Sequence, residues 1–386
     1  MPIAILALAL GAFGIGLTEF AIVGLLPEVA TDLRITEAAA GWLVSGYALT
    51  VALGAVLITL AVARWNRKHV LLALFTLFIL GNAVCALALT YAMMLVGRII
   101  AALCHGAFFG IGLALAVGLV AEDRQSRAVA LILTGLTTSN VIGVPFGTWL
   151  GQQYGWRAAF WAIVIVGVLA LAAIAVWVPL ARSSAPAEVH LIDELSAFTQ
   201  RRLWLALAVT LLTFASIFAA FTYIAFTLVG IGKFSASAIP WILVAFGLGQ
   251  FGGTLLGGRE ADRSITRAVL ITLIGLACAQ TILAVTAGNQ ILSVAALILM
   301  GAFGFGSVPA LQTGVITLAG SAPTLASSAN ISAINLGIAL GAVAGGEAIA
   351  AGLGYRSPIW IGALLAVVAV IMVLASQGRP ASSPPH

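Results

Sequence analysis

The sequence predicts an all-α polytopic membrane protein, in which twelve transmembrane helices form two pseudo-symmetric six-helix halves. Three observations lead to this class: a very low charge content, twelve long apolar runs and an internal repeat. Only 8% of the 386 residues are charged and 62% are hydrophobic, whereas an ordinary soluble domain is about 25% charged. So few charges cannot cover the surface of a soluble protein of this size, and the composition excludes a soluble enzyme and a disordered chain.

The apolar runs match the length that a bilayer requires. A helix needs about 20 mainly apolar residues to cross the hydrocarbon core. Twelve runs meet this requirement: 4–27, 40–62, 69–90, 92–119, 127–151, 157–180, 203–229, 238–258, 268–287, 291–318, 325–351 and 358–376. The first run is longer than a signal-peptide core and follows no basic segment, so we interpret it as a retained helix.

The runs divide the chain into an N-terminal half over 1–180, a linker over 181–202, a C-terminal half over 203–376 and a tail over 377–386. Four apolar linker residues fall on one helical face, which predicts a short helix on the membrane surface: Leu191, Ile192, Leu195 and Phe198. The tail is polar and rich in Pro and Ser, so it is predicted to be disordered.

Basic residues are distributed unevenly between the loops on the two sides. The loops on the side of the termini carry twelve: Arg64, Arg67, Lys68, Arg124, Arg127, Arg182, Arg201, Arg202, Arg259, Arg263, Arg267 and Arg379. The loops on the other side carry four: Arg34, Arg157, Lys233 and Arg356. Because cytoplasmic loops are enriched in Lys and Arg, both termini are predicted to be cytoplasmic. The net charge of +5 therefore reports orientation, and no nucleic-acid partner is expected.

The chain also repeats itself at half its length. Three segments recur at offsets of 194 to 199 residues: GWRAAFW at 155–161 as GYRSPIW at 354–360, GAFFG at 106–110 as GAFGFG at 301–306, and Gly143, Gly147 and Gly151 as Gly337, Gly341 and Gly345. The pattern also recurs as GAFGIG at 11–16, so the first, fourth and tenth runs are interpreted as equivalents within three-helix repeats. Two halves built in this way are typical of secondary transporters, whose site lies between the halves.

Several motifs identify a family. The chain resembles major facilitator superfamily transporters over nearly its full length, and within them the drug:proton antiporter group, in the branch of sugar-efflux, chloramphenicol-resistance and purine-efflux proteins. The resemblance rests on GLTEFAIVGLLPEVATDL at 16–33, ARWNRK at 63–68, GRIIAALCHGAFFG at 97–110, GLTTSNVIGVPFGTWLG at 135–151 with the following GWRAAF, and GGREADRS at 257–264. It implies alternating access, export driven by the proton gradient, and a bacterial inner-membrane location.

Glu19 and Arg98 are the two charged residues expected deep in the membrane at similar depth. A charge at such a position costs about 2.5–3.5 kcal/mol or more and is usually functional. We expect Glu19 to carry the proton and Arg98 to be its ion-pair partner, a role that the resemblance also implies for an arginine in the fourth run. The alternatives are a Glu19 that only joins two helices, and an Arg98 that bonds backbone carbonyls.

Two further ionisable residues fall within apolar runs. His105 shares a helical face with Arg98, seven residues before it. An embedded His can relay protons, and the alternative is a polar residue that lines the cavity. Glu347 lies toward the outer end of the eleventh run, where it could reach the interface instead of taking part in coupling.

The fifth run contains Pro145 within a set of glycines: Gly135, Gly143, Gly147 and Gly151. Glycines at four-residue spacing let helices approach closely, and Pro145 removes a backbone hydrogen bond and bends the helix. We expect this helix to pack at the interface between the halves and to pivot there. By resemblance the pattern is the fifth-helix motif associated with antiporters, although ordinary close packing needs the same residues.

Two loops resemble the gating motif of the superfamily, which holds an Asp-Arg pair. The second loop keeps this pair as Asp262 and Arg263. The first has Ala63 where Asp is expected but retains its basic residues, Arg64, Arg67 and Lys68. These basic residues are interpreted as gating residues, and the alternative is that they only set the orientation.

Polar side chains deep in the runs are the candidates for the substrate cavity: Tyr47, Asn140, Tyr223, Gln250, Asn330 and Asn335. Because this set carries no fixed charge, the expected substrate is a small neutral or amphiphilic compound, such as a drug, sugar or metabolite. The predicted function is proton-coupled efflux by a monomer. The alternatives are a proton symporter or uniporter that imports a solute and, from another class, a membrane-embedded enzyme.

No cofactor or metal is expected. The chain has no GxxxxGK[ST] phosphate-binding loop, so ATP does not drive transport directly. Cys85, Cys104 and Cys278 lie in apolar runs without metal-ligand spacing, and we interpret them as small hydrophobic residues.

Overall fold

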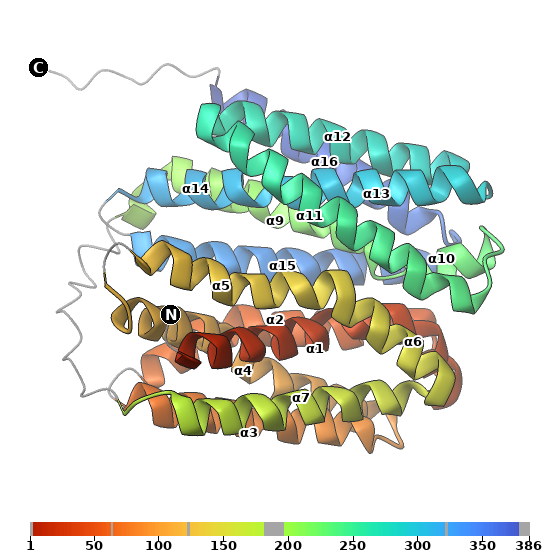
Figure 1. The fold of residues 1–386 in the computed structure, drawn as a ribbon. Coiled ribbons are helices and arrows are strands. Elements are labelled where there is room, and N and C mark those ends of the chain that lie inside the picture. The colour runs from red at the N-terminus through yellow and green to blue at the C-terminus, as the bar shows by residue number, and fades with distance from the viewer. Residues whose placement is uncertain (1–2, 63–64, 122–123, 181–196, 321–322, 378–386) are drawn as a thin grey trace, which may run out of the picture.

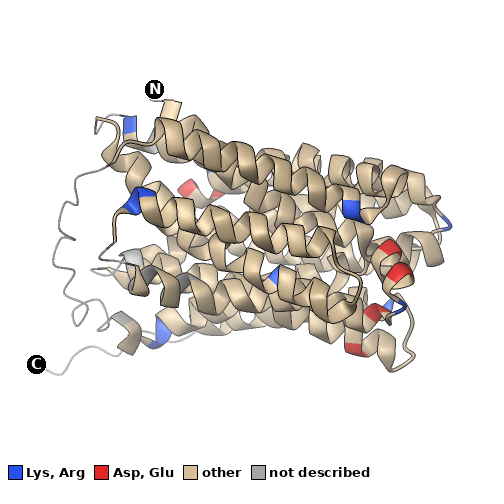
Figure 2. Cartoon of the chain, turned by 90° about the horizontal axis from the view of Figure 1, so that it is seen from below, with Lys and Arg blue, Asp and Glu red and all other residues tan. Residues whose placement is uncertain are grey.

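The fold is a bundle of membrane-spanning helices. The computed structural model describes residues 3–62, 65–121, 124–180, 197–320 and 323–377, in which all regular structure is helical. Figure 1 shows that α1 begins and α16 ends at the same end of the bundle. We call this end the terminal side and the opposite end the far side. Charged residues gather mostly at these two ends (Figure 2).

The first half is formed by the helices that precede residue 181. Their bounds are α1 (Ile3–Leu33), α2 (Glu37–Ala61), α3 (Arg67–Ala86), α4 (Tyr91–Gly118), α5 (Gln125–Thr138), the π-helix η2 (Ser139–Gly143), α6 (Val144–Tyr154) and α7 (Trp156–Trp177). The helix α1 continues six residues beyond the predicted end at position 27. Gly155 separates α6 from α7 in a left-handed conformation (φ 89°) that favours glycine.

The second half has the same number of spans. Its bounds are η3 (Ala197–Thr199), α9 (Arg201–Phe221), α10 (Ile224–Gly230), η4 (Ala236–Ala238), α11 (Ile239–Arg263), α12 (Ile265–Thr286), α13 (Gln290–Gly306), α14 (Val308–Ala319), α15 (Pro323–Ala350) and α16 (Ser357–Gln377). In the described residues, eleven segments are long and apolar enough to cross a membrane. With the 25-residue α2, they correspond to the twelve predicted spans.

The predictions for the linker and the tail mostly lie outside the described residues. Leu191, Ile192 and Leu195 are not described, and neither is the chain from 378 onward. Phe198 lies in η3, where its ring centroid is 6.0 Å from that of Trp204 in α9. The surface helix and the disordered tail therefore stay predictions.

The two halves repeat one inter-helix hydrogen bond. In the first half, the Thr18 hydroxyl on α1 contacts Oδ1 of Asn82 on α3 at 3.2 Å. In the second half, the Ser216 hydroxyl on α9 contacts Oε1 of Gln280 on α12 at 3.1 Å. Both pairs are buried, and both members are offset by 198 residues. The repeat seen in the sequence is thus also a repeat of packing.

The fifth span packs against α11 at the interface between the halves, whereas its glycines face α1 inside the first half. A Cβ on Gly135 would meet the main-chain oxygen of Ala9 on α1, and one on Gly151 would lie 2.7 Å from Leu25 on the same helix. Gly143 and Gly147 also face α1. In the second half, Gly337, Gly341 and Gly345 of α15 face the backbone of α9 in the same way. The glycines therefore allow the fifth span to pack closely against the first span, and the eleventh span to pack closely against the seventh.

The halves meet along α2 and α15, which run antiparallel. The Ser45 hydroxyl on α2 donates to the Ala339 oxygen at 3.2 Å, and the Ser332 hydroxyl on α15 donates to the Ala52 oxygen at 2.9 Å. These contacts are seven residues apart on each helix, about two turns. On the other side of the bundle, η2 and α6 pack against α11. The interface therefore includes these two sets of contacts, and α1 adds a third through its contacts with α10 and the stacking of Phe20 on Phe218 of α9.

Candidate functional site

A buried polar cluster joins α1, α2 and α4 within the first half. It comprises Glu19 from α1, Tyr47 from α2, and Arg98 and His105 from α4. Arg98 is 0% exposed, Tyr47 1%, His105 7% and Glu19 8%. The seven-residue spacing of Arg98 and His105 places both on one face of α4. The structure thus brings the three predicted coupling residues together and adds Tyr47, which the sequence assigned to the substrate cavity.

Arg98 binds main-chain carbonyl groups. Its Nε donates to the Leu43 oxygen of α2 at 3.1 Å, and its terminal nitrogens donate to the Thr18 and Glu19 main-chain oxygens of α1. The guanidinium carbon also lies 4.2 Å from the centroid of the Tyr47 ring, which is a cation–π geometry. Arg98 therefore ties α4 to α1 and α2.

The predicted ion pair between Arg98 and the Glu19 carboxylate is not among the salt bridges of the described residues. His105 occupies that position instead, with its Nδ1 4.0 Å from Oε2 of Glu19. The same Nδ1 lies 3.3 Å from the Tyr47 hydroxyl. Glu19 and Arg98 do lie at similar depth, since Arg98 reaches the main-chain oxygen of Glu19. Depth alone does not fix the direction in which a side chain points around its helix.

Glu19 and His105 can share a proton once their side chains approach to hydrogen-bond distance, which is shorter than the 4.0 Å that separates them here. A neutral imidazole has one nitrogen that accepts a hydrogen bond, while a protonated imidazole donates from both. A protonated Glu19 can donate toward a neutral His105, and a charged His105 can pair with an ionised Glu19. A carboxyl group in low-dielectric surroundings disfavours its charged form unless such a partner is present.

A small cavity lies next to this cluster, between the two halves. It has a volume of about 10 Å³, which is near the minimum for one water molecule. Its walls are Phe20, Asn140, Val144, Phe221, Leu243, Phe246, Gln250 and Phe305. Phe20 follows Glu19 directly, so α1 presents one residue to the polar cluster and the next to this cavity. We call it the central cavity.

The central cavity combines aromatic walls with two amides. The rings of Phe221 and Phe246 are stacked with centroids 4.3 Å apart. Oδ1 of Asn140 is buried and has no hydrogen-bond partner in the described structure. A buried acceptor without a donor is costly, so this oxygen is available to a donor on a bound molecule.

The other predicted cavity residues do not line the central cavity. Tyr223 lies between α9 and α10, and its hydroxyl donates to the Ala342 oxygen of α15 at 2.7 Å. Asn330 donates to Oε1 of Gln312 on α14 at 2.6 Å, and Asn335 donates to the Ile331 oxygen of its own helix at 3.0 Å. Of the six candidates, Asn140 and Gln250 line the central cavity.

The fifth span changes from α-helix to π-helix beside the central cavity. The π-helix η2 joins α5 to α6 in a continuous helical run, and Pro145 is the second residue after it, so the missing N–H of Pro145 leaves a carbonyl of the preceding turn without its helical donor. A Cβ on Gly247 of α11 would lie 3.0 Å from the Cα of Val141 in η2. The fifth span therefore meets the second half through its π-helix, while its glycines face the other way. Such π-helical turns are frequent at functional sites.

The residues predicted to take part in gating have different partners from those expected. In the second loop, Arg263 pairs with Glu260 at 3.2 Å and Arg267 pairs with the same carboxylate at 3.0 Å, while Asp262 is exposed. In the first loop, Nζ of Lys68 donates to the Ala175 oxygen at the end of α7 at 2.7 Å, and Arg67 is exposed. Arg64 lies outside the described residues.

Several residues of the second loop and of the central cavity could not be identified from the sequence. Glu260 stands beside the Asp-Arg pair of the motif, and nothing in the motif distinguishes it as the ion-pair partner of Arg263 and Arg267. Phe20, Phe221, Phe246 and Phe305 are four of 18 phenylalanines in an apolar chain, and helical periodicity cannot separate a cavity wall from a lipid-facing surface. The position of Phe20 next to Glu19 was the one signal that could have identified it.

Comparisons with known proteins agree with this architecture. The sequence matches the Major Facilitator Superfamily over residues 8–233 and 203–386. It is 39% identical to the Inner membrane transport protein YdhP of Escherichia coli (strain K12) over 97% of this chain and 96% of the relative. It is 32% identical to a chloramphenicol resistance protein of Streptomyces lividans, over 96% of this chain and 95% of the relative.

A solved structure shares the fold at low sequence identity. The D-xylose–proton symporter superposes with a TM-score of 0.76 at 16% identity, covering 96% of each chain. Helix order, the two repeated halves and the sequence matches lead to one conclusion. The chain belongs to the major facilitator superfamily of membrane transporters, and it is not an enzyme.

Proposed function

We propose that this protein exports small neutral or amphiphilic compounds in exchange for protons, by alternating access between its two halves. The observation that carries the proposal is the placement of α1, on which Glu19 lies 4.0 Å from His105 while the adjacent Phe20 lines the central cavity. An embedded carboxyl group beside a titratable imidazole is typical of a proton site. The cavity between the halves is where such folds bind their substrates.

The proposed cycle uses Glu19 as the proton carrier and His105 as its exchange partner. A proton that arrives from the far side neutralises Glu19. Its transfer to His105 forms an imidazolium beside an ionised Glu19, and its release from His105 to the terminal side restores the neutral imidazole and leaves Glu19 ionised for the next proton. Arg98 holds the three helices in register through its carbonyl contacts. Tyr47 contacts Arg98 through the face of its ring and His105 through its hydroxyl group.

The proposed orientation places both termini in the cytoplasm of a bacterium, with the far side outside the inner membrane. It rests on the excess of Lys and Arg in the loops of the terminal side. The S. lividans relative is named a chloramphenicol resistance protein, which favours export of drug-like compounds. The solved proton symporter has the same fold, so the fold by itself leaves the direction open.

Purified protein in liposomes with an imposed pH gradient tests this proposal, with radiolabelled chloramphenicol as the probe. Wild-type protein should accumulate the probe on the side with the higher proton concentration, and a protonophore should abolish this accumulation. Glu19→Gln should lose accumulation by more than tenfold yet retain exchange at equal pH. Glu347→Gln, an exposed carboxyl on α15, is the matched control and should behave as wild type.

Two results would contradict the proposal. Protonophore-sensitive accumulation by Glu19→Gln would remove Glu19 from the coupling step. Movement of the probe in the same direction as the protons would identify a symporter in place of an exporter.

A further inference from the structure

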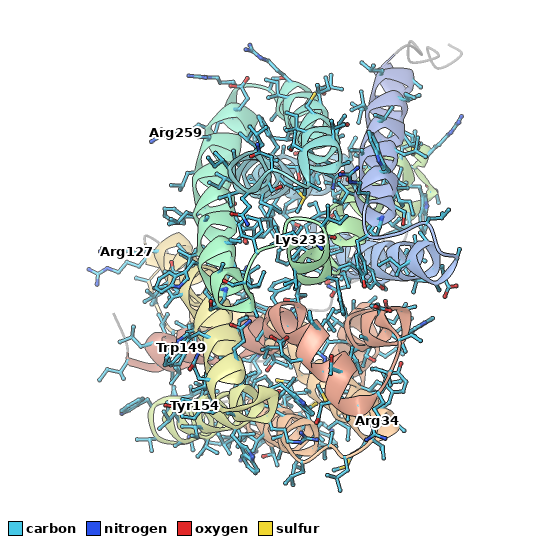
Figure 3. The ribbon with its side chains drawn as sticks, turned by 90° about the vertical axis from the view of Figure 1, so that its right-hand side faces the viewer. Arg34, Arg127, Trp149, Tyr154, Lys233 and Arg259 are labelled. Carbon is cyan, nitrogen blue, oxygen red and sulfur yellow. The ribbon has the colours of Figure 1, made fainter. Side chains whose placement is uncertain are left out.

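A second cavity lies between the halves on the far side. It has a volume of about 460 Å³, and its walls include Gly24, Glu28 and Gln152 from the first half and Ala225 and Ile239 from the second. Figure 3 views the molecule from this side, where Arg34 belongs to the first half and Lys233 to the second. The cavity uses none of the residues of the polar cluster or of the central cavity.

The two cavities share their walls at regular helical steps. Phe20 lines the central cavity and Gly24 lines the far-side cavity on α1, as do Leu243 and Ile239 on α11. Phe221 and Ala225 line the two cavities on either side of the break between α9 and α10. Residues four apart lie on one face of a helix, about 6 Å along its axis. The far-side cavity is therefore the continuation of the central cavity toward the far side.

Gly24, which lines the far-side cavity, packs against Thr148 and against Leu243, which lines the central cavity. A Cβ on Gly24 would meet the Thr148 hydroxyl and would lie 2.9 Å from the Leu243 side chain. Thr148 is 0% exposed and Leu243 is 4% exposed. Gly24 and Thr148 belong to the first half and Leu243 to the second, so any separation of the halves on this side moves Leu243 away from Gly24.

The carboxyl group of Glu28 in the far-side cavity has an unused oxygen. Oε1 accepts from Gln152 at 3.2 Å, whereas Oε2 is buried without a hydrogen-bond partner. The neighbouring Asp32 is already paired with Arg157 at 2.7 Å and accepts from Trp156 at 3.0 Å. Among the salt bridges of the described residues, none involves Glu28, so its charge is left for a cation or a donor group.

We propose that this cavity is the exit vestibule of the transport path and that Glu28 receives the ammonium or amino group of a cationic amphiphile there. The layer of Gly24, Thr148 and Leu243 is its inner barrier. This inference rests on the proposed export function, and it extends the substrate class from neutral compounds to organic cations. A cation that has passed the aromatic walls of the central cavity would then bind the Glu28 carboxylate before its release.

Equilibrium binding tests the role of Glu28 independently of transport. The probe is ethidium, a fluorescent cation with amino groups, titrated onto purified wild-type protein, Glu28→Gln and Glu347→Gln. Loss of a charge-assisted contact should raise the Kd of ethidium about tenfold in Glu28→Gln. The matched carboxyl-to-amide change at Glu347 should leave it within twofold. Equal weakening in both variants, unchanged binding in Glu28→Gln, or no binding to wild type would overturn the cation site.

Cysteine labelling tests the barrier. In a background with Cys278→Ser, Thr148→Cys and Gln152→Cys are exposed to a charged, membrane-impermeant thiol reagent on the far side. Gln152→Cys should react rapidly in the resting protein, whereas Thr148→Cys should react slowly at rest and at least tenfold faster while chloramphenicol and a pH gradient drive turnover. Thr148→Cys that reacts no faster while the liposomes transport chloramphenicol would overturn the exit route without affecting the export function. Failure of all transport with ethidium still bound at Glu28 would contradict the export function alone.

Discussion

At the residue scale, Arg98 shows how a buried charged side chain can hold together the helices that form a site. Its guanidinium is fully buried, and its hydrogen bonds go to carbonyl oxygens of two other helices. A planar group with five donors can satisfy several acceptors at once, whereas a lysine ammonium is a compact point charge. Because Arg98 is occupied by carbonyl groups, the Glu19 carboxyl group is left to interact with His105. Neither Glu19 nor His105 needs Arg98 as an ion-pair partner.

Arg98→Lys should therefore keep the charge but lose stability. Main-chain acceptors left without a donor cost about 1–3 kcal/mol each, so we expect a melting temperature lower by roughly 5 °C. Thermal unfolding in detergent measures this shift. A variant that melts like wild type but no longer couples export to protons would show that the charge of Arg98, and not its carbonyl contacts, is what matters.

At the element scale, the glycines of the fifth span fix how closely it approaches α1. Gly135→Ala would place a methyl group against the Ala9 carbonyl, and overpacking of this kind costs about 1–3 kcal/mol. Gly252 of α11 is the matched control, because a Cβ there meets nothing within 4 Å. Gly252→Ala should be neutral or stabilising by about 0.5–1 kcal/mol.

Thermal unfolding of both variants, together with their expression in membranes, checks this pair. If Gly252→Ala were destabilised as much as Gly135→Ala, the close approach of α5 to α1 would not be the reason for the glycine.

The same element shows what the sequence could and could not predict. Span number, the repeat and the missing hydrogen bond at Pro145 follow from hydropathy and local backbone chemistry, which act along the chain. Which face of a span meets which neighbour depends on packing among twelve helices. For that reason the glycines proved to face α1, and Tyr47 proved to join the polar cluster. Glu19 was found because a deep carboxyl is rare, while its contact with His105 depends on how α1 and α4 are rotated.

At the scale of the whole molecule, two hydrogen bonds among the described residues join the halves on the far side, one from Gln152 to the Ala236 oxygen at 3.0 Å and one from Tyr355. The Tyr355 hydroxyl, in the loop between α15 and α16, donates to Glu37 at the start of α2 at 2.9 Å. Partial burial and the neighbouring Glu37 carboxylate raise the pKa of Tyr355 above its ordinary value near 10. The fold thus favours the neutral, hydrogen-bond-donating form of Tyr355. The contribution of Tyr355 to the stability of the folded state is fully present below its unfolded-state pKa, and it is lost only as the pH rises through the raised pKa.

Tyr355→Phe should shift the protein toward states that are open on the far side. Loss of about 1 kcal/mol changes such an equilibrium about fivefold, so labelling of Thr148→Cys in the resting protein should accelerate by that factor, equally at pH 6 and pH 8. Ser357→Ala removes a hydroxyl from the same loop whose hydrogen bond stays within it, and it should leave the labelling rate unchanged. A rate that depends on pH between these values would mean that another titrating group controls the closure.

The adjacency of Glu19 and Phe20 has a mechanical consequence. Successive residues of an α-helix project about 100° apart, so α1 exposes one side chain to the proton-sharing cluster and the next to the interface between the halves. A turn of α1 about its own axis displaces both side chains together, with no intermediate residues to transmit it. Through one rigid helix, the charge state of the polar cluster can therefore influence whether a molecule binds in the central cavity.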